Sequence, residues 1–423
     1  MSIADRKEVK ELLRYPLLQA IAHRRARRFP LGCTLDGDGI RYASKHPPLP
    51  LSDIETAILC WSGNGVTGAI TADLPTDTGG NLFGSWLGKT VPYACNVHNV
   101  KLFFTNDGGT FVYDPQTATR PVEIETEADW EKIMTYYRES CVKVLDERVE
   151  FVPKSLLRSI HWNTNKPGTT VFIPVVDQTA EYIDFLLGVF DYEGYGYQMF
   201  DDKKGQQAGL QRWIESGRLK GPKVSLTSYE FNMVGLNQAP AYMMMENIHL
   251  VAEAMGLGSV VFGGYTGTVM LGVTPMSKGL GFRSVTGKDG KLNPVGLDGI
   301  FEAYCPPYYG SMDEAIDAFV DKKFGSGAPF AADYKGLVAF KDWKRIQSRY
   351  HHPSRASIDL VKAFCRYVYE TYGRFPATFD TMLVPIWLQV HHLDVDFYDE
   401  YYPKEMVTEA QRRHIELWHK EAK

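Results

Sequence analysis

Apolar residues return at helical spacing in several stretches of the chain, and the clearest of these follows Pro240. Its apolar positions are Met244, Ile248, Val251 and Met255. This spacing places the four side chains on one face of a helix, and a proline is tolerated in a helix's first turn. Gly256 or Gly258 fits the end of such a helix. The pattern therefore predicts an amphipathic helix that begins near residue 240.

Other stretches combine helical spacing with signals for a helix end. Residues 4–22 predict an amphipathic helix that Pro16 breaks or kinks. Ser52, with Glu55 three residues later, forms a capping box, which predicts a helix from there to about Ser62. We expect three further helices, at 128–149, 310–325 and 355–373.

Runs rich in β-formers predict strands between these helices. Two such runs flank the sequence Asn-Asp-Gly-Gly at 106–109, which is a strong turn signal, so we expect a hairpin there. The run at 169–176 predicts a strand, and the segment 180–190 predicts a helix after it. Because helices alternate with short strands and the sheet has hairpin character, an α+β fold is favoured over a doubly wound parallel sheet.

Bulk composition limits the classes of partner. The 423 residues are 44% hydrophobic and 23% charged, with a formal net charge of -5. General nucleic-acid binders and anionic-membrane binders are usually basic, so both classes are disfavoured. No apolar run approaches the roughly 18 residues that span a bilayer, and the N-terminus lacks a secretory apolar region. Six cysteines without C-x-x-C spacing favour reduced thiols. We therefore expect a cytoplasmic protein.

Arginines crowd one short segment, at positions 24, 25, 27 and 28. Guanidinium groups this close repel one another, and arginine is suited to bidentate contact with phosphate. One interpretation is therefore a local phosphate site in a chain that is acidic overall. The alternative is a solvated basic helix end, where cations complement the helix dipole.

Other candidate sites carry less specific signals. No G-x-G-x-x-G in a strand–turn–helix frame and no G-x-x-x-x-G-K-[ST] occurs, which disfavours a Rossmann site or a P-loop. Cys95, Asn96 and His98 precede a predicted strand, where they either face a ligand or form a turn.

The C-terminal region gathers side chains of the metal-binding type. They are His391, His392, Asp394, His414 and His419. Their spacing matches no standard metal motif, adjacent histidines point apart, and residues five apart do not share a helix face. We therefore expect aromatic packing and hydrogen bonding in this region, and no metal site.

Three segments, in this order, resemble the FMN-dependent nitroreductase superfamily. "RRARRF" at 24–29 is similar to its R-R-S-x-R phosphate signature. Residues 51–68 followed by "ACNVHNVKLFF" are similar to its helix and to its S-x-N-x-Q-P-W-x-F strand entry. "ENIHLVAEAMGLGSVVFGGY" at 246–265 is similar to its N-x-x-L-A-A-x-x-L-G-L-G helix and the loop beyond. The resemblance covers roughly half the chain and is closer to the longer members of the superfamily.

The resemblance implies which residues bind the cofactor phosphate. The anion would be the phosphate of FMN, held by Arg24, Arg25 and Arg28, with Arg27 as a fourth candidate. Ala26 stands where the superfamily usually has serine, so one hydroxyl contact is lost. A late basic contact to the phosphate would be supplied by Lys323 in "VDKKFG".

It also implies which residues surround the flavin ring. Asn96 would lie beside the isoalloxazine or the ribityl chain, and Tyr93 and His98 would be the candidates for catalysis nearest the flavin edge. The far side of the ring would meet Phe262, Gly263 and Gly264. The acidic group of the superfamily's Pro-x-Glu motif is missing from this last segment.

The resemblance implies a nitroreductase-like α/β sandwich that forms a homodimer with two FMN sites at the subunit interface. Residues 1–150 and 238–334 would form the two parts of the core. Residues 151–237 would be an insertion, and its glycine-spaced aromatics suit either a lid or a packed loop. Residues 335–423 would be a C-terminal helical extension.

The implied activity is hydride transfer through flavin N5 between NAD(P)H and a small, flat or activated substrate. Two alternatives stay open. One is an oxidase or dehydrogenase that acts on a peptide-derived or other natural-product intermediate with oxygen as acceptor. The other is a non-catalytic flavin-binding or assembly protein. Turnover of NAD(P)H separates the first of the three activities from the last.

Overall fold

The computed structural model describes residues 3–70, 85–115, 124, 126–150, 158–191, 196–263, 267–350 and 352–419. Its α-helices are α1 (Lys7–Leu13), α2 (Leu17–His23), α3 (Asp53–Asn64), α4 (Glu131–Ser140), α5 (Gln178–Asp191), α6 (Gln211–Glu215), α7 (Leu226–Met255), α8 (Thr268–Leu271), α9 (Met312–Phe324), α10 (Trp343–Gln347), α11 (Arg355–Tyr372), α12 (Val395–Tyr401) and α13 (Glu409–Trp418). Its strands are β1 (Thr34–Asp36), β2 (Arg41–Ala43), β3 (Val66–Ala69), β4 (Leu87–Lys89), β5 (Val100–Asn106), β6 (Gly109–Tyr113), β7 (Cys141–Leu145), β8 (Thr170–Asp177), β9 (Gln198–Asp201), β10 (Gln206–Gln207), β11 (Lys223–Ser225), β12 (Gly258–Phe262), β13 (Arg283–Thr286), β14 (Leu292–Leu297), β15 (Phe301–Glu302), β16 (Met382–Leu383) and β17 (Trp387–His391).

One antiparallel sheet forms the centre of the fold, with strand order β12-β17-β8-β5-β6-β7 and with β16 beside β8. Both of its faces are covered. Along β8, Phe172 and Val176 belong to a core cluster with α3 and α7, whereas Ile173 and Val175 belong to a cluster with α5, α9 and α11. The mixture of helices with an antiparallel sheet confirms the α+β expectation, and burial of both faces explains why β8 is a continuous apolar run.

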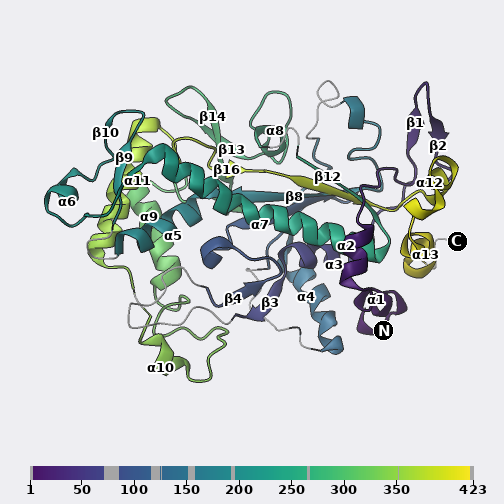
Figure 1. Cartoon of the computed structure of the whole chain (residues 1–423), viewed down its shortest axis with the longest axis horizontal. Helices are drawn as coiled ribbons and strands as arrows, with labels where there is room; N and C mark the ends of the chain where they lie inside the picture. The colour runs from purple at the N-terminus through teal and green to yellow at the C-terminus, as the bar shows by residue number, and fades with distance from the viewer. Residues whose placement is uncertain are drawn as a thin grey trace.

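The long helix α7 runs across the sheet, and α3 packs against its second half (Figure 1). The predicted start at Pro240 was wrong, because α7 begins at Leu226 with Ser225 as its N-cap and Pro240 lies inside it. The first half of α7 has no amphipathic pattern in its sequence, because it buries the polar residues Glu230 and Asn237 and leaves Phe231 exposed. An amphipathic helix is recognised from apolar residues on the buried face and polar residues on the exposed face, and here some of these positions are reversed.

Other local predictions divide between confirmed and wrong. The break at Pro16 is confirmed, since α1 and α2 lie on either side of it. The Ser52–Glu55 capping box is confirmed at the start of α3, as is the hairpin of β5 and β6. The helix expected at 128–149 ends at Ser140, because residues 141–145 form β7 and pair with β6.

The segments predicted as an insertion and as a C-terminal extension both contribute strands to the central sheet. The segment 151–237 supplies β8, and the segment 335–423 supplies β17, and both strands lie in the middle of the sheet. A strand buried on both faces needs neighbours on both sides, and here distant segments provide them. Residues 192–195, part of the predicted lid, lie outside the described residues, while β9 after them joins a small sheet with β10 and β11.

The two ends of the described chain lie at the same end of the molecule, where α1 contacts α13 (Figure 1). The arginine segment leaves α2 at this end. Among the helices of the described residues, none combines the length and the apolar character that crossing a membrane requires.

The turn after α7 requires a glycine. Gly256 has a φ of +89°, and a Cβ added to it would lie 2.3 Å from the carbonyl oxygen of Ala410 at the start of α13. Gly256→Ala is therefore expected to lower the free energy of unfolding by about 2 kcal/mol or more, because the left-handed conformation alone costs about 1–2 kcal/mol for a residue with a side chain.

Gly235→Ala is the matched control for this substitution. Gly235 lies within α7, and a Cβ added there meets nothing within 4 Å. Alanine is favoured over glycine in a helix by about 0.5–1 kcal/mol, so this variant should be slightly more stable than the wild type. Urea denaturation measures both, and a Gly256→Ala protein as stable as the Gly235→Ala protein would contradict the described turn.

Candidate functional site

The arginine segment extends the edge of the central sheet. After α2 ends at His23, the Arg27 backbone nitrogen donates to the carbonyl of Ser259 in β12 at 3.1 Å. Further on, Leu31 donates to the carbonyl of His392 at 3.1 Å. These contacts fix the backbone, so the side chains of the segment take alternating environments.

Arg27 is the buried member of the group. Its side chain is 2% exposed, and Nη1 donates to Oε2 of Glu253 in α7 at 2.5 Å. Nε donates to the carbonyl of Met406 at 2.8 Å, and Nη2 donates to the carbonyl of His23 at 3.4 Å. Because each of its nitrogens is engaged inside the protein, Arg27 is removed from the phosphate candidates and instead ties α7 to the C-terminal segment.

Arg24, Arg25 and Arg28 face solvent. Arg24 forms an ion pair with Glu246 of α7, with Nε and Oε1 3.2 Å apart and both side chains more than 40% exposed. The Arg28 guanidinium carbon lies 5.7 Å from the centre of the Phe262 ring. Three exposed cations therefore lie on one short backbone segment, one of them in a solvent-exposed ion pair.

A pocket of about 370 Å³ lies beside these arginines. Its lining includes Arg25 and Arg28 and the aromatic residues Trp162, Phe397 and Tyr398. The Tyr398 hydroxyl accepts a hydrogen bond from the Arg28 backbone nitrogen at 2.7 Å, so the pocket wall positions the arginine backbone directly. The pocket combines guanidinium groups with apolar aromatic walls, which suits a ligand with an anionic end.

Large apolar side chains are exposed on α2, which ends directly before the arginine segment, and on α7. These two helices contact each other, and their exposed large apolar residues are Leu17, Leu18 and Ile21 on α2 and Phe231, Leu236, Tyr242 and Met243 on α7. Leu18 is 79% exposed and Phe231 is 77% exposed. We call this set the α2/α7 face. The Arg24–Glu246 ion pair links the segment that follows α2 to α7.

Two loops expected near the flavin ring leave the same end of the sheet. Phe262 pairs with Trp387 at the end of β12, and Val100 pairs with Val176 at the start of β5. The strands β17 and β8 separate them, which corresponds to about 14 Å across the sheet. Phe262 stacks on Trp387 with ring centres 4.2 Å apart, and Gly263 after it is exposed. Gly264 lies outside the described residues.

The loop before β5 has an unusual backbone. Cys95, Asn96 and His98 have φ values of 48°, 51° and 55°, in the left-handed region. Such conformations cost about 1–3 kcal/mol each and persist only where surrounding contacts impose them. Here the Asn96 amide nitrogen donates to the carbonyls of Ser85 and Leu87 at 3.2 and 3.4 Å.

Two predicted catalytic candidates lie in this loop. Nε2 of His98 is 2.7 Å from Oδ1 of Asn96, so the ring donates there. Burial lowers the pKa of His98 well below its usual value, so the ring is neutral. The Tyr93 hydroxyl is 3.2 Å from Oδ1 of Asn64, and burial raises its pKa. Both side chains therefore hold the loop, and neither is prepared as a base at neutral pH.

Lys323 does not lie with the arginines. Its Nζ donates to Oδ1 of the buried Asp184 at 2.5 Å, which joins α9 to α5. Figure 1 places α9 and α2 toward opposite ends of the long axis. The sequence spacing gave no sign of this pairing, because Asp184 is 139 positions away.

Near Lys323, burial of Glu181 makes the free energy of unfolding depend on pH. Burial raises the pKa of Glu181 to about 8, against an opposing contact from the Cys95 thiol. Between the ordinary glutamate pKa and about 8, the folded state holds a proton that the unfolded state has released. Rising pH therefore favours unfolding across this window, by up to about 1.4 kcal/mol per pH unit.

Glu181→Gln removes this term, so its stability relative to wild type should increase from pH 5 to pH 8 and then level off. Urea denaturation at a series of pH values measures the difference. A difference that is constant with pH, or that falls as pH rises, would show that Glu181 is ionised in the folded protein.

Comparison with known proteins gives limited information. No family model matches the chain, and no curated protein matches it. Among solved structures, one similar chain is described as a "putative nitroreductase" from Ralstonia eutropha JMP134. It shares 16% identity over 59% of this chain and 70% of its own length, with a TM-score of 0.26. A TM-score this low does not establish a shared fold, so the function rests on the residues themselves.

Proposed function

We propose that this chain is an FMN-dependent oxidoreductase that holds the FMN phosphate with Arg24, Arg25 and Arg28. The observation that carries the proposal is the group of three solvent-facing arginines, held on the sheet edge beside an aromatic pocket and an apolar helical face. A solvated helix end would need no such surroundings. The sequence resemblance supports FMN as the cofactor, and the exposed arginines beside the pocket support this position for its phosphate.

The residues present offer arginine contacts for the phosphate end of FMN and fewer contacts for its ring. Arg28 reaches along the sheet edge to Phe262, which connects the arginine segment to the sheet end from which Gly263 emerges. That path supports a ligand with its phosphate at the arginines and its ring toward Gly263. Arg27 and Lys323 do not belong to this site, because each is paired with a buried carboxylate.

We propose that the protein acts as a homodimer through the α2/α7 face. Seven large apolar side chains are exposed on it: Leu17, Leu18, Ile21, Phe231, Leu236, Tyr242 and Met243. Exposed apolar patches of this kind are typical of protein interfaces. Since the Arg24–Glu246 ion pair links the arginine segment to α7, a second copy would cover the phosphate site and exclude water from it.

Bound FMN would supply hydride chemistry, with NAD(P)H as the donor. The chain's own contribution is binding and positioning. The arginines fix the phosphate, and the loop held by Asn96, His98 and Tyr93 presents a rigid backbone at the same sheet end. Neutral His98 donates its Nε2 proton to Asn96, so it is expected to position that amide.

The visible absorption spectrum of the purified protein tests this function, followed by anaerobic addition of NADPH or NADH. The expected result is a flavin band, present as purified or after adding FMN, that bleaches with one of the two nucleotides. A flavin band that resists both nucleotides but bleaches with another donor would contradict NAD(P)H as the donor. A protein that stays colourless and binds no added FMN would overturn the proposal.

A further inference from the structure

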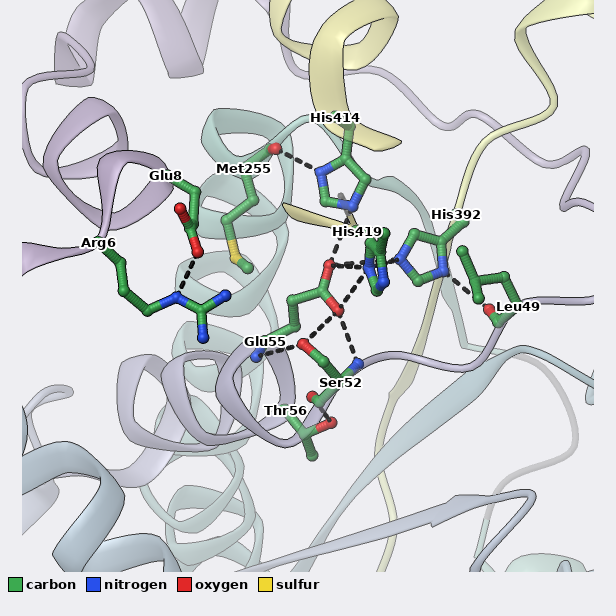
Figure 2. Close-up of polar contacts among 10 residues, drawn as sticks. All are labelled: Arg6, Glu8, Leu49, Ser52, Glu55, Thr56, Met255, His392, His414 and His419. Carbon is green, nitrogen blue, oxygen red and sulfur yellow. Dashed lines mark hydrogen bonds and ion pairs between the residues drawn. The ribbon is translucent and has the colours of Figure 1, made fainter. Parts of the chain in front are cut away.

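Four side chains of metal-binding type converge at the end of the molecule that holds both chain ends (Figure 2). Glu55 comes from the first turn of α3, and His392 directly follows β17. His414 lies in α13, and His419 is the residue at which that helix ends. The side chains of the first three are at most 2% exposed, and that of His419 is 12% exposed. We call these four residues the Glu55–histidine cluster.

Distances within the cluster match those between ligands of one small cation. Oε1 of Glu55 is 2.9 Å from Nε2 of His414 and 3.3 Å from Nε2 of His392. Nε2 of His392 is 2.9 Å from Nε2 of His419. All of the candidate ligand atoms lie within 4.8 Å of one another. Tetrahedral zinc with bonds of about 2.0–2.1 Å has its ligand atoms about 3.3 Å apart, so small ring movements complete the geometry.

Backbone carbonyls orient two of the rings. Nδ1 of His392 lies 2.8 Å from the carbonyl oxygen of Leu49, and Nδ1 of His414 lies 2.8 Å from that of Met255 (Figure 2). A carbonyl only accepts, so each Nδ1 carries the proton. In the neutral ring Nε2 then presents its lone pair to the centre of the cluster. This outer contact is the usual arrangement of a metal-binding histidine.

The carboxylate is also held from outside. Oε2 of Glu55 accepts hydrogen bonds from the backbone nitrogen of Ser52 at 2.6 Å and from its hydroxyl at 2.7 Å. These are the contacts of the capping box that begins α3. Nε2 of His419 lies 3.2 Å from Oε1 and 3.1 Å from Oε2 of the same carboxylate, so Glu55 is held from outside while it faces the histidines as one ligand group.

One buried atom in the cluster has no hydrogen bond. Nε2 of His414 lies close to Oε1 of Glu55 but is not aligned for a hydrogen bond with it or with any other group of the described residues. The His414 side chain is 2% exposed, and a buried polar atom without a partner lowers the stability of the fold unless something binds it. A cation at the centre of the cluster would satisfy this atom, neutralise Glu55 and remove the repulsion between the lone pairs.

We propose that Glu55, His392, His414 and His419 bind one divalent transition-metal ion, with zinc as the best fit. Three imidazoles and one carboxylate suit zinc, and four protein ligands fill a tetrahedral shell. No position is left for a substrate, so the site is structural. It would fasten the end of α13 to α3 and to the end of β17. The proposal is independent of the flavin function.

Other polar residues of the same region take no part in the cluster. His391 points away from His392, with its Nδ1 3.4 Å from the Gln389 amide. Asp394 caps α12 by accepting from the Phe397 backbone nitrogen at 3.1 Å, and it also accepts from the Tyr42 hydroxyl. Of the five C-terminal side chains of metal-binding type, only His392, His414 and His419 therefore belong to the cluster. Glu55 joins them from 337 positions before His392.

The test uses the full-length protein without a histidine tag, freed of metal by a chelator and then titrated with Zn²⁺ or Co²⁺. Metal analysis should give one ion per chain, and zinc should raise Tm. Cobalt should give the intense visible bands of tetrahedral coordination. His419→Ala should weaken zinc binding by more than the 10–100-fold that loss of an outer contact costs. His46→Ala is the control, because His46 is 55% exposed and outside the cluster.

Glu55→Gln provides a second variant, because its amide oxygen still accepts from Ser52 while the charged ligand is lost. We expect it to fold, as judged by circular dichroism, and to lose the tetrahedral cobalt spectrum. A wild-type protein that binds neither Zn²⁺ nor Co²⁺ would overturn the proposal. So would metal binding that is equal in the wild type, His419→Ala and Glu55→Gln, since the ion would then lie elsewhere.

Discussion

Replacing Arg27 by methionine is expected to destabilise the folded chain by about 3–5 kcal/mol, the usual cost of breaking a buried ion pair by removing one partner. The substitution leaves the carboxylate of Glu253, which is 1% exposed, without its cation. It also frees the Met406 carbonyl that Nε of Arg27 contacts. Methionine fills much of the arginine's volume, so the loss reports charge and hydrogen bonding more than a cavity.

The loss should grow with pH. Burial raises the pKa of Glu253 to about 6 even with Arg27 opposing it, so removal of Arg27 raises this pKa further. When a carboxyl has a higher pKa in the folded state than in the unfolded state, the protein loses stability as pH rises through the folded pKa. Urea denaturation should therefore show a larger difference between wild type and Arg27→Met at pH 8 than at pH 5.

Arg24→Met is the matched control for Arg27→Met. Arg24 is three positions away and also pairs with a glutamate of α7, but both members of this pair are exposed. The expected loss in the free energy of unfolding is therefore below about 1 kcal/mol. Combining Arg27→Met with Glu253→Leu removes both charges and should recover much of the stability. Equal stabilities for Arg24→Met and Arg27→Met would contradict the burial of Arg27.

Replacing Arg24 and Arg28 together by alanine is expected to weaken FMN binding at least about 100-fold. Each hydrogen bond from a guanidinium to a phosphate contributes about 1.5–3 kcal/mol, so two together contribute about 3–6 kcal/mol. Both side chains are exposed, so the variant should fold as the wild type does. Titration of each protein with FMN, followed by flavin fluorescence, measures the dissociation constants.

Arg345→Ala is the control for this experiment, because Arg345 is exposed on α10 and far from the arginine segment in Figure 1. It removes one positive charge without touching the pocket. If the Arg24→Ala/Arg28→Ala protein binds FMN as the wild type and Arg345→Ala proteins do, these arginines do not hold the phosphate.

The fold could be predicted where local signals agree with burial. The capping box at Ser52 and Glu55, the turn at 106–109 and the uniform apolar run of β8 each fix an element without help from distant residues. The first half of α7 could not be predicted, because Glu230 is buried there by contacts to Tyr182, Ala377 and Thr378. Its partners are far away in sequence, so no local pattern reveals them.

The arginine segment shows the same limit at the level of a site. Spacing alone identifies four cations, but it cannot separate Arg27 from its neighbours, because the partner that buries it is Glu253, 226 positions away. Backbone pairing with β12 fixes which side chains turn inward. The positive charge of the segment was thus predictable, and the division between buried and exposed arginines was not.

Helix spacing does not apply to His419, because this residue lies just beyond the end of α13. Residues five apart do not share a helix face, but α13 ends at Trp418, and His419 has left the helical conformation with φ of -128° and ψ of 52°. It can therefore turn toward the same point as His414. The capping box accounts for the fourth member, Glu55, and nothing in its sequence context indicates a second role.

FMN is expected to bind to the arginines beside an interface between two copies of this chain. Sedimentation velocity of the FMN-treated protein, recorded at both a protein and a flavin wavelength, tests it most directly. The flavin absorbance should sediment with a species of twice the chain mass, at one FMN per chain. Flavin that sediments as the free cofactor, or with a species of single-chain mass, would contradict the claim.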